Sequence, residues 1–476
     1  MTEDRIYDVV VLGAGPVGEN VADTCRAAGL GAAVVESELV GGECSYWACM
    51  PSKALLRPVT ARADARRVPG LRAAVQGPLD TAEIFASRDG FTSGWKDDGQ
   101  VEWLDSAGID LFRGTARLDG AKRVSVTAAD GTVTALTARH AVAVCTGTRA
   151  VLPDLPGIDG ARPWTSREAT SAREVPARLA VVGGGVVGVE MAAAWQALGA
   201  QVTVLVRGDG LLPRMEPFAG ELVADGLKEA GAEIRTGVSV TELRRDGATV
   251  TLTLDDGSTL DVEEVLFATG RAPRTDDLGL ASVGLEDGAW IDVDDSLRVP
   301  GHDWLYAVGD VNHRALLTHQ GKYQARIAGA AIAARAQGVP ILETDPWGAH
   351  AATADHAAVP QVVFTDPEAA SVGLTLAEAE RAGHRVRAVD QEMSAAAGAG
   401  LYAEGYKGRA RMVVDLDREI LLGVTFVGPA VGELIHSATV AIAGEVPVAR
   451  LRHAVPSYPT ISEIWLRLIE AYVAGK

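Results

Sequence analysis

The sequence has few cysteines, few aromatic residues and no long apolar run. Only four of its 476 residues are cysteine, and 5% are aromatic. No stretch approaches the roughly 18 apolar residues of a membrane helix, which argues against a membrane protein. The start, MTEDRIYDVVVLGAG, lacks the long apolar region and cleavage site of a signal peptide. We therefore expect a cytoplasmic protein, in which a structural disulfide is unusual.

Positive charge is also scarce. Lys and Arg number 44 against 63 Asp and Glu, which gives a formal net charge of -19. Because no basic block offsets this charge, binding to nucleic acid or to an anionic membrane is disfavoured. Hydrophobic residues make up 47% and charged residues 22%, as in ordinary globular proteins, and the length implies roughly three domains.

An internal repeat is present. In each copy a short strand is followed by a glycine turn, a helix, a glycine break and a second strand. In the first copy the strand spans 8–12, the helix ends near Ala28 and the second strand ends at Val35. In the second copy the strand spans 179–182, the helix ends near Leu198 and the second strand ends at Leu205. Gly29 and Gly199 each follow the last motif glycine by 11 residues. A shared order and spacing of this kind indicates two copies of one nucleotide-binding unit.

The rest of the chain gives weaker signals. Residues 60–125 are expected to be polar and helical, and 133–144 alternate as strands before a Thr-Gly turn. A second strand and Thr-Gly turn, VLFATG, closes the second copy. Residues 360–430 mix short strands with helices such as Leu376 to Ala382, which is typical of a separate α+β domain.

The first glycine motif is Gly13-Ala14-Gly15-Pro16-Val17-Gly18, placed between a strand and a helix. In this motif Gly13 makes the turn, Gly15 lets backbone approach a pyrophosphate, and Gly18 lets the helix pack on the strand. Glu36 follows Gly18 by 18 residues, where an acid can bind both ribose hydroxyls.

The second motif contains Gly183, Gly185 and Gly188. Eighteen residues beyond Gly188 stands Val206 in place of an acid, and Arg207 and Arg214 follow. An arginine here accommodates a 2′-phosphate, whereas an acid would repel it. We infer a preference for NADPH over NADH, with surface arginines of no cofactor role as the alternative.

Two of the four cysteines lie in the stretch GGECSYWACMPSK, at Cys44 and Cys49. In an ideal helix, residues five apart lie roughly 8 to 9 Å apart at Cα. That exceeds the roughly 7 Å limit for a disulfide, so a helix carrying both must be distorted. A strained pair next to a nucleotide unit favours redox chemistry, and two unrelated buried cysteines are the alternative. Tyr46 and Trp47 either shape the entrance to Cys44 or pack the distorted turn.

These motifs resemble those of the FAD-dependent pyridine nucleotide-disulfide oxidoreductases, the family of glutathione reductase, dihydrolipoamide dehydrogenase and mercuric reductase. The resemblance covers essentially the whole chain: GAGPVG with Glu36, GGECSYWACMPSK, GGGVVG, ATGRAP, the LYAVGD run and a terminal YPTISE. It implies an α/β fold with two Rossmann-like dinucleotide-binding domains and a C-terminal α+β dimerisation domain. The implied ranges are 1–150 and 276–345 for FAD, 151–275 for NAD(P)H and 346–476 for dimerisation.

The resemblance also implies a role for individual residues. Cys49 would be the thiolate against the flavin and Cys44 the outer thiol that attacks substrate. Lys53 would lie near flavin N5, paired with Glu190, and stabilise negative charge there. Further cofactor-binding candidates are Gly147 and Gly270 in the two Thr-Gly turns, Gly309 and Asp310, which would hold the ribityl chain, and Thr318 and His319, at the start of a helix facing the pyrimidine edge. The implied cofactors are FAD and NADPH, with NADH possible, and no metal site is expected.

The C-terminus departs from the family pattern. The family carries a histidine, oriented by a glutamate and supplied by the other subunit of a homodimer, that protonates the leaving thiolate. Here that position is Tyr458, followed by Glu463. Tyrosine, with a reference pKa near 10, is a poor proton shuttle at neutral pH. His453 is either a substitute or a surface residue. Mercuric reductase has tyrosine there, but it also needs a C-terminal cysteine pair, and the other cysteines here, Cys25 and Cys145, look like small core residues.

Three functions are open at this point. The first is an NADPH-dependent reductase of a small disulfide, which predicts slow turnover without the histidine. The second is a reductase of quinones, metal ions or other acceptors, which need no protonated leaving thiol. The third is a redox sensor or complex component, against which stands the set Glu36, Lys53, Glu190 and Asp310.

Overall fold

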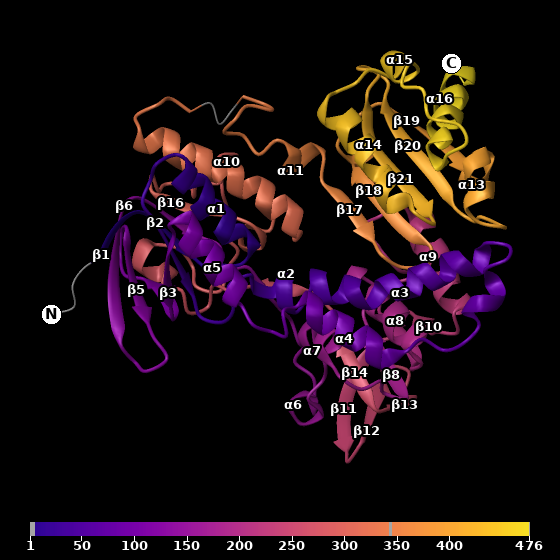
Figure 1. The fold of residues 1–476 in the computed structure, drawn as a ribbon, viewed down its shortest axis with the longest axis horizontal. Coiled ribbons are helices and arrows are strands. Elements are labelled where there is room, and N and C mark those ends of the chain that lie inside the picture. The colour runs from indigo at the N-terminus through magenta and orange to yellow at the C-terminus, as the bar shows by residue number, and fades with distance from the viewer. Residues whose placement is uncertain (1–4, 342–344, 476) are drawn as a thin grey trace. The chain divides into compact units, whose positions relative to one another are not determined.

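The computed structural model describes residues 5–341 and 345–475. The chain divides into two compact units (Figure 1). The first comprises Met1–Met50, Asp89–Ala150 and Gly270–His356, and the second comprises Pro51–Arg88, Val151–Thr269 and Ala357–Lys476. Residues 1–4, at the start of the first expected domain, and 342–344, before the boundary expected at 345, lie outside the described residues. The three expected domain boundaries stay predictions.

The first unit is built on a seven-stranded sheet in the order β3-β2-β1-β6-β5-β4, with β16 also paired to β6. The β1, β2, β3, β6 and β16 pairings are parallel, and β4 and β5 are antiparallel. The bounds are β1 Arg5–Leu12, β2 Ala32–Glu36, β3 Asp110–Arg113, β4 Thr115–Leu118, β5 Arg123–Thr127, β6 Val133–Val144 and β16 Leu305–Ala307. A separate pair joins β7 (Thr148–Ala150) to β15 (Arg271–Pro273).

The apolar run of β1 explains why this sheet is buried on both faces. Successive side chains of a strand point to opposite faces. Val9 and Val11 belong to one core cluster, and Val10 and Leu12 belong to another. Helices α1 (Pro16–Ala27) and α10 (Thr318–Ala336) contribute to the first cluster and lie beside each other in Figure 1.

The second unit has a four-stranded parallel sheet in the order β10-β9-β8-β14 and a three-stranded antiparallel sheet, β11-β12-β13. The bounds are β8 Arg178–Val182, β9 Gln201–Val206, β10 Glu233–Thr236, β11 Val240–Asp246, β12 Thr249–Leu254, β13 Thr259–Val262 and β14 Glu264–Phe267. Helix α8 (Val186–Leu198) packs against β8 and β9, and much of it is buried because it is apolar nearly all round.

The C-terminal part of this unit is a five-stranded antiparallel sheet in the order β17-β18-β21-β20-β19. The bounds are β17 Pro360–Val363, β18 Glu368–Gly373, β19 Val386–Glu392, β20 Arg409–Asp415 and β21 Leu421–Gly428. Helix α14 (Val431–Ala443) packs on β18 and β21, and α16 (Ile464–Ala474) packs on β19 (Figure 1).

The remaining helices range from single turns to the long helix α3. They are α2 Gly42–Tyr46, α3 Cys49–Arg67, α4 Thr81–Phe91, α5 Asp98–Ala107, α6 Ile158–Ala161, α7 Ser166–Ser171, α9 Pro217–Glu229, α11 Ala354–Ala357, α12 Leu376–Arg381, α13 Ala397–Tyr402 and α15 Val448–Leu451, with 3-10 turns at Arg72–Val75, Leu280–Val283, Asp310–Asn312, Met393–Ala395 and Ile461–Glu463. Among the described residues, no helix has both the length and the apolar character needed to cross a membrane.

The expected fold class, α/β with two Rossmann-like units and a C-terminal α+β region, is confirmed. The internal repeat is also present: Gly29 and Gly199 both have positive φ at the ends of α1 and α8. The expectation for residues 60–125 was wrong at its C-terminal end, which forms β3, β4 and the start of β5. β3 and β4 are only four residues long and largely exposed, so they lack the apolar alternation that marks a strand.

Candidate active site

The first glycine motif forms the turn that leads from β1 into α1. Gly13 has a φ of 98°, and a Cβ there would lie 2.6 Å from the carbonyl oxygen of Cys145. A Cβ on Gly18 would lie 1.9 Å from the carbonyl oxygen of Gly13, so only glycine lets the helix approach the strand. Gly15 faces nearly open space and stands at the N-terminus of α1, where no side chain caps the helix. Uncapped backbone N–H groups at a helix start are suited to a pyrophosphate.

Glu36 is the last residue of β2. One of its carboxylate oxygens accepts a hydrogen bond from the Ala14 backbone N–H, at 2.8 Å, and the other accepts one from the Glu38 N–H, also at 2.8 Å. A carboxylate has about four lone-pair sites, so acceptor capacity remains for ribose hydroxyls.

Two polar atoms of the first unit support the fit of a dinucleotide. The Thr146 hydroxyl and the Oε1 of Glu19 are buried with no hydrogen-bond partner among the described residues. Burial raises the pKa of Glu19 to about 7, against which Lys322 acts in the opposite direction. Buried polar atoms in native proteins normally have a partner, so these two mark polar groups that a ligand can satisfy. These two polar atoms, together with the open space at Gly15, are consistent with FAD binding in this unit.

The second motif repeats the geometry of the first. Gly183 has a φ of 123°, and a Cβ there would lie 2.4 Å from the carbonyl oxygen of Ala268. A Cβ on Gly188 would lie 2.1 Å from the Gly183 oxygen, and Gly185 faces open space at the uncapped start of α8. The strand that follows, β9, ends at Val206 without an acid. Arg207 and Arg214 are both exposed in the loop after it.

Cys44 and Cys49 lie on two different helices. Cys44 is the third residue of α2, which ends at Tyr46, and Cys49 is the first residue of α3. The chain leaves the helical conformation at Trp47, where φ is -137°. The distortion expected from the spacing is therefore present between the two cysteines. The Cys49 sulfur lies 3.4 Å from the hydroxyl of Thr318, the first residue of α10.

The surroundings of Cys44 raise the pKa of its thiol. The hydrogen bond with Cys49 raises the pKa of Cys44 above the usual range of a thiol, and burial of Cys44 adds to the effect. A nearby negative charge on Cys49 acts in the same direction, whereas Thr318 and Lys322 lower the pKa of Cys44. These surroundings therefore disfavour a thiolate at Cys44.

Tyr46 packs the turn between the cysteines. Its side chain is only 1% exposed, and its hydroxyl donates to the backbone oxygens of Val40 and Lys96. The indole N–H of Trp95 donates to the Tyr46 backbone oxygen at 3.1 Å. Of the two roles that the sequence left open for Tyr46, the structure therefore supports packing of the turn.

Two arginines hold the redox helix at Glu43, a contact that the sequence did not indicate. Arg274 donates to one carboxylate oxygen of Glu43 at 3.0 Å, and Arg271 approaches the other at 3.5 Å. Glu43 stands next to Cys44 on α2, while the arginines belong to the ATGRAP segment and the residue after it. An acid beside the cysteine and two arginines after the Thr-Gly turn were the available signal, but nothing in the sequence paired them.

Arg271 also orients Asp310, through the side chain of Thr148. Arg271 Nε donates to the Thr148 hydroxyl at 2.6 Å, and that hydroxyl donates to Asp310 Oδ2 at 2.8 Å. Burial raises the pKa of Asp310 above its ordinary value, and the Thr148 bond partly opposes this. Gly309, before it, donates its N–H to Gln324 Oε1 at 2.8 Å. This chain of bonds fixes a single orientation for the Asp310 carboxyl group.

In the second unit, Lys53 of α3 forms an ion pair with Glu190 of α8. The Lys53 Nζ lies 2.7 Å from Glu190 Oε2. The Glu190 side chain is 4% exposed and that of Lys53 is 35% exposed. The other oxygen of Glu190 accepts the Phe364 N–H at 3.0 Å, and the ammonium also lies 4.9 Å from the Phe364 ring centre. The pairing expected from the sequence is present; its role beside a flavin stays a prediction.

The expected site residues near the C-terminus differ in their exposure. Tyr458 is 78% exposed, and His453 is also exposed, as the surface reading predicted. Glu463 is buried, and its carboxylate accepts from the Gly398 N–H at 3.2 Å and the Thr460 N–H at 3.3 Å. Glu463 therefore caps a turn within its own chain.

The other expected residues stand near turns and helix starts. Gly147 and Gly270 lie at positive φ before β7 and β15, and His319 is exposed at the start of α10. Cys25 and Cys145 are buried in the core of the first unit, as expected. No group of three or more candidate metal ligands occurs in the part of the chain that the structure describes.

Two dinucleotide motifs and a thiol pair define a flavin-dependent redox enzyme. A family described as "Pyridine nucleotide-disulphide oxidoreductase" matches residues 7–338, and its "dimerisation domain" matches residues 359–469. The chain therefore belongs to the pyridine nucleotide-disulphide oxidoreductases. It is an FAD-dependent oxidoreductase of the class that acts on disulfides or related acceptors, and the second match supports a homodimer.

Similar proteins agree with this membership. The dihydrolipoyl dehydrogenase of Thermus scotoductus is 32% identical over 98% of this chain and 97% of its own. The mercuric reductase of Staphylococcus aureus is 28% identical over 97% of this chain and 81% of its own. The solved structure of LpdA from Mycobacterium tuberculosis has a TM-score of 0.84 at 25% identity and covers 98% of this chain and 99% of its own. The HOCl-induced flavoprotein disulfide reductase RclA from Escherichia coli, at 23% identity and a TM-score of 0.82, covers the same shares and is similar in fold.

Proposed function

We propose that the chain is an NADPH-dependent disulfide reductase that passes electrons from NADPH through FAD to Cys44 and Cys49, and then to a small disulfide. The thiol pair is the observation that supports this most, because two helices hold the sulfurs in hydrogen-bond contact. When bound, FAD supplies two-electron transfer between the nicotinamide and this pair.

Each thiol has its own step in the proposal. Cys44 loses its proton, attacks one sulfur of the substrate disulfide and displaces the other sulfur as a thiolate, which takes up a proton. Cys49 then attacks the Cys44 sulfur, forms the Cys44–Cys49 disulfide and releases the second thiol of the substrate. Thiol–disulfide exchange proceeds through a mixed disulfide of this kind. Two electrons from NADPH restore the dithiol.

The other site residues hold and orient the cofactors in this proposal. Gly13, Gly15, Gly18 and Glu36 would hold FAD at its pyrophosphate and ribose, and Asp310 at its ribityl chain. Lys53 supplies a positive charge whose position Glu190 fixes, and the start of α10, at Thr318 and His319, supplies backbone N–H groups to the pyrimidine edge. The YPTISE segment of one subunit reaches the thiol pair of the other, so that each site needs both chains of the homodimer.

Tyr458→His should raise the rate of disulfide reduction at pH 7 by about tenfold or more, because an imidazole both accepts and donates protons near neutral pH. The pKa of Cys44 is raised, so the wild-type rate should climb as pH rises above neutrality; the variant should reach the same rate at lower pH. Steady-state rates between pH 6 and 9 check this. Tyr458→Phe is the matched control. If Tyr458→His loses activity while Tyr458→Phe keeps it, the missing-acid account is wrong.

Arg207→Ala should raise the KM for NADPH by about tenfold while leaving that for NADH within about twofold, because one charge-assisted bond to the 2′-phosphate is lost. Arg207 is exposed after β9, and no acid stands at the end of that strand. Arg244→Ala, an exposed arginine of the same unit outside the motif, is the control. Equal effects of Arg207→Ala on the two KM values would remove its proposed role.

A second function is favoured by Tyr458 and by the raised pKa of Cys44. Both hinder disulfide exchange at neutral pH, whereas reduction of a quinone, a metal ion or another electron acceptor leaves no thiolate to protonate. One relative is named a mercuric reductase. Assays with NADPH on oxidised lipoamide and glutathione disulfide, beside quinones and metal ions, test the choice. Turnover of the second group alone would replace the disulfide proposal.

We also propose a cytoplasmic location. Cys25 and Cys145 are buried in the core and Cys44 and Cys49 form the proposed redox pair, so no pair serves as the structural disulfide that oxidising compartments favour. Fractionation of the native source with a disulfide-oxidised marker protein as control tests this.

A further inference from the structure

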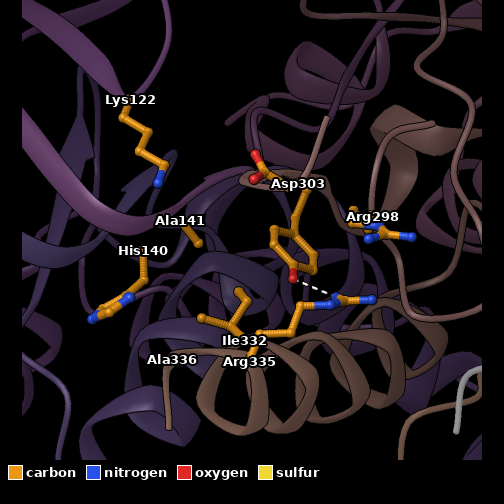
Figure 2. A pocket seen from close by; sticks show the side chains of 9 residues that line it. Lys122, His140, Ala141, Arg298, Asp303, Ile332, Arg335 and Ala336 are labelled. Carbon is orange, nitrogen blue, oxygen red and sulfur yellow. Dashed lines mark hydrogen bonds between the residues drawn. The ribbon is translucent and has the colours of Figure 1, made fainter. Parts of the chain in front are cut away.

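A basic pocket lies in the first unit, outside the site described above. It is a cavity of about 260 Å³ between β6, β16, the C-terminal turns of α10 and the turn before β5 (Figure 2). Three side chains that are cationic at neutral pH line it: Lys122, Arg298 and Arg335. Figure 2 shows Lys122 on one side of the pocket and Arg298 on the other. In a chain with a net charge of -19, such a group of cations is unusual.

The two arginines retain donors for a ligand. Arg335 uses two of its nitrogens, which donate to the hydroxyls of Tyr306 and Ser296. Arg298 donates from Nε to Asp294 at 3.2 Å, and its two terminal nitrogens have no hydrogen-bond partner among the described residues. A guanidinium has five N–H donors in a planar fork that matches the oxygens of a phosphate or carboxylate.

The Tyr306 hydroxyl adds a neutral donor between these arginines. Its ring is 1% exposed, and its oxygen accepts from Arg335, which leaves the hydroxyl proton for a ligand. Burial raises the pKa of Tyr306, so the hydroxyl keeps its proton at neutral pH. The Arg335 and Arg298 charges act against this shift and the Asp294 carboxylate adds to it, which places both arginines and this carboxylate near the hydroxyl.

The charge of the pocket suits an anion. Asp303 is the acid in its lining and Asp294 pairs with Arg298, so the three cations exceed these two carboxylates by one. His140 also lines the pocket. A phosphate monoester carries about -1.5 to -2 at pH 7. Ala141 and Ile332 line the apolar part, which a short carbon skeleton can contact, and the volume is below that of drug-sized pockets.

Lys122 is held in an unfavourable backbone conformation at the rim. Its φ is 61°, and its ammonium donates to the Arg139 backbone oxygen at 3.1 Å. Such a conformation is unfavourable for a non-glycine residue, and it places this cation on the pocket.

From these observations we propose that the pocket binds a small phosphorylated metabolite, with its phosphate group held by Arg298, Arg335 and the Tyr306 hydroxyl. The carbon part lies against Ala141 and Ile332. Neither the thiol pair nor the nicotinamide site takes part, so this proposal stands apart from the disulfide-reductase activity.

Calorimetric titration of the FAD-loaded dimer with inorganic phosphate at constant ionic strength tests the proposal. Saturable binding is expected, and Arg298→Gln should weaken it by about tenfold or more, because one charge-assisted contact is lost. Arg326→Gln, an exposed arginine on the same helix α10 that does not line the pocket, should leave it unchanged. Phosphate that still binds in Arg207→Gln does not occupy the second nucleotide site, so that variant measures the binding that belongs to this pocket.

Lys122→Asn provides a second variant should Arg298→Gln fold poorly, because asparagine tolerates positive φ. It should also weaken phosphate binding. The proposal is overturned if phosphate does not saturate the protein, if the pocket variants bind like the Arg326→Gln control, or if succinate binds and phosphate does not.

Discussion

Replacement of Cys44 by serine should lower the rate of disulfide reduction by on the order of 10³-fold or more, because the attacking group is lost. A serine hydroxyl does not ionise at neutral pH and cannot form the mixed disulfide. The change keeps the backbone of α2 and the size of the side chain, so FAD should stay bound and NADPH should still bleach it. Steady-state assay of disulfide turnover, together with stopped-flow absorbance of the flavin, measures both effects.

Cys49→Ser is the matched variant, because it removes the other sulfur of the pair. It leaves Cys44 able to attack but removes the thiol that resolves the adduct. The substrate should therefore stay attached to Cys44 and appear in the protein mass, with release on treatment with a reductant. Undiminished disulfide turnover by Cys44→Ser would show that another group attacks the substrate, and retained quinone or metal-ion turnover would assign the enzyme to the second function.

The second large effect is expected from Lys53→Met. This change leaves the Glu190 carboxylate, only 3% exposed, with the Phe364 N–H as its remaining hydrogen-bond donor. An unpaired buried charge costs about 3–5 kcal/mol when fully buried; because Lys53 is 35% exposed, we expect about 2 kcal/mol of lost stability. Flavin reduction by NADPH should slow by about a hundredfold, since the positive charge is gone. Thermal unfolding and stopped-flow reduction measure the two effects.

Lys407→Met is the control for this experiment. Lys407 and Glu229 pair at the same 2.7 Å, but their side chains are 73% and 65% exposed. A pair in water is worth about 0–1 kcal/mol, so this variant should be nearly as stable as the wild type. The double variant Lys53→Met/Glu190→Leu has no buried charge. Its stability should therefore recover, whereas its rate of flavin reduction should stay low. Recovery of both would mean that Lys53 acts only through folding.

The parts of the site that could be predicted from the sequence depend mostly on residues close together in the chain. A glycine turn between a strand and a helix needs residues within six positions, which is why both motifs fold as expected. The break between Cys44 and Cys49 follows from their spacing alone. The Lys53–Glu190 pair joins residues 137 apart, and only the family resemblance suggested it.

The missed parts depend on tertiary contacts. Glu43 meets Arg271 and Arg274 across more than 220 positions, and each is an ordinary charged residue when taken alone. The packing role of Tyr46 was left open because its contacts come from a distant segment, the loop between α4 and α5. There the Lys96 backbone oxygen accepts from the Tyr46 hydroxyl, and the Trp95 indole donates to the Tyr46 backbone oxygen. The short strands β3 and β4 were missed because neighbouring strands, and not their own apolar residues, hold them in place.

The pKa of Cys44 links these observations to turnover. The pKa of Cys44 is raised, and the residue at the histidine position is an exposed tyrosine. Both features slow a disulfide exchange at neutral pH, which is why the identity of the acceptor and the pH profile must be measured together. A small disulfide that leaves as a stable thiolate would suit this site best.

Anaerobic titration of the purified protein with NADPH, followed in the visible spectrum, tests the central claim most directly. We predict that a long-wavelength band appears after two electrons, as expected for a Cys49 thiolate against the oxidised flavin, and that Cys49→Ser lacks it. Direct bleaching of the wild type without that band would contradict the account, because the thiol pair would then be out of electronic contact with the flavin.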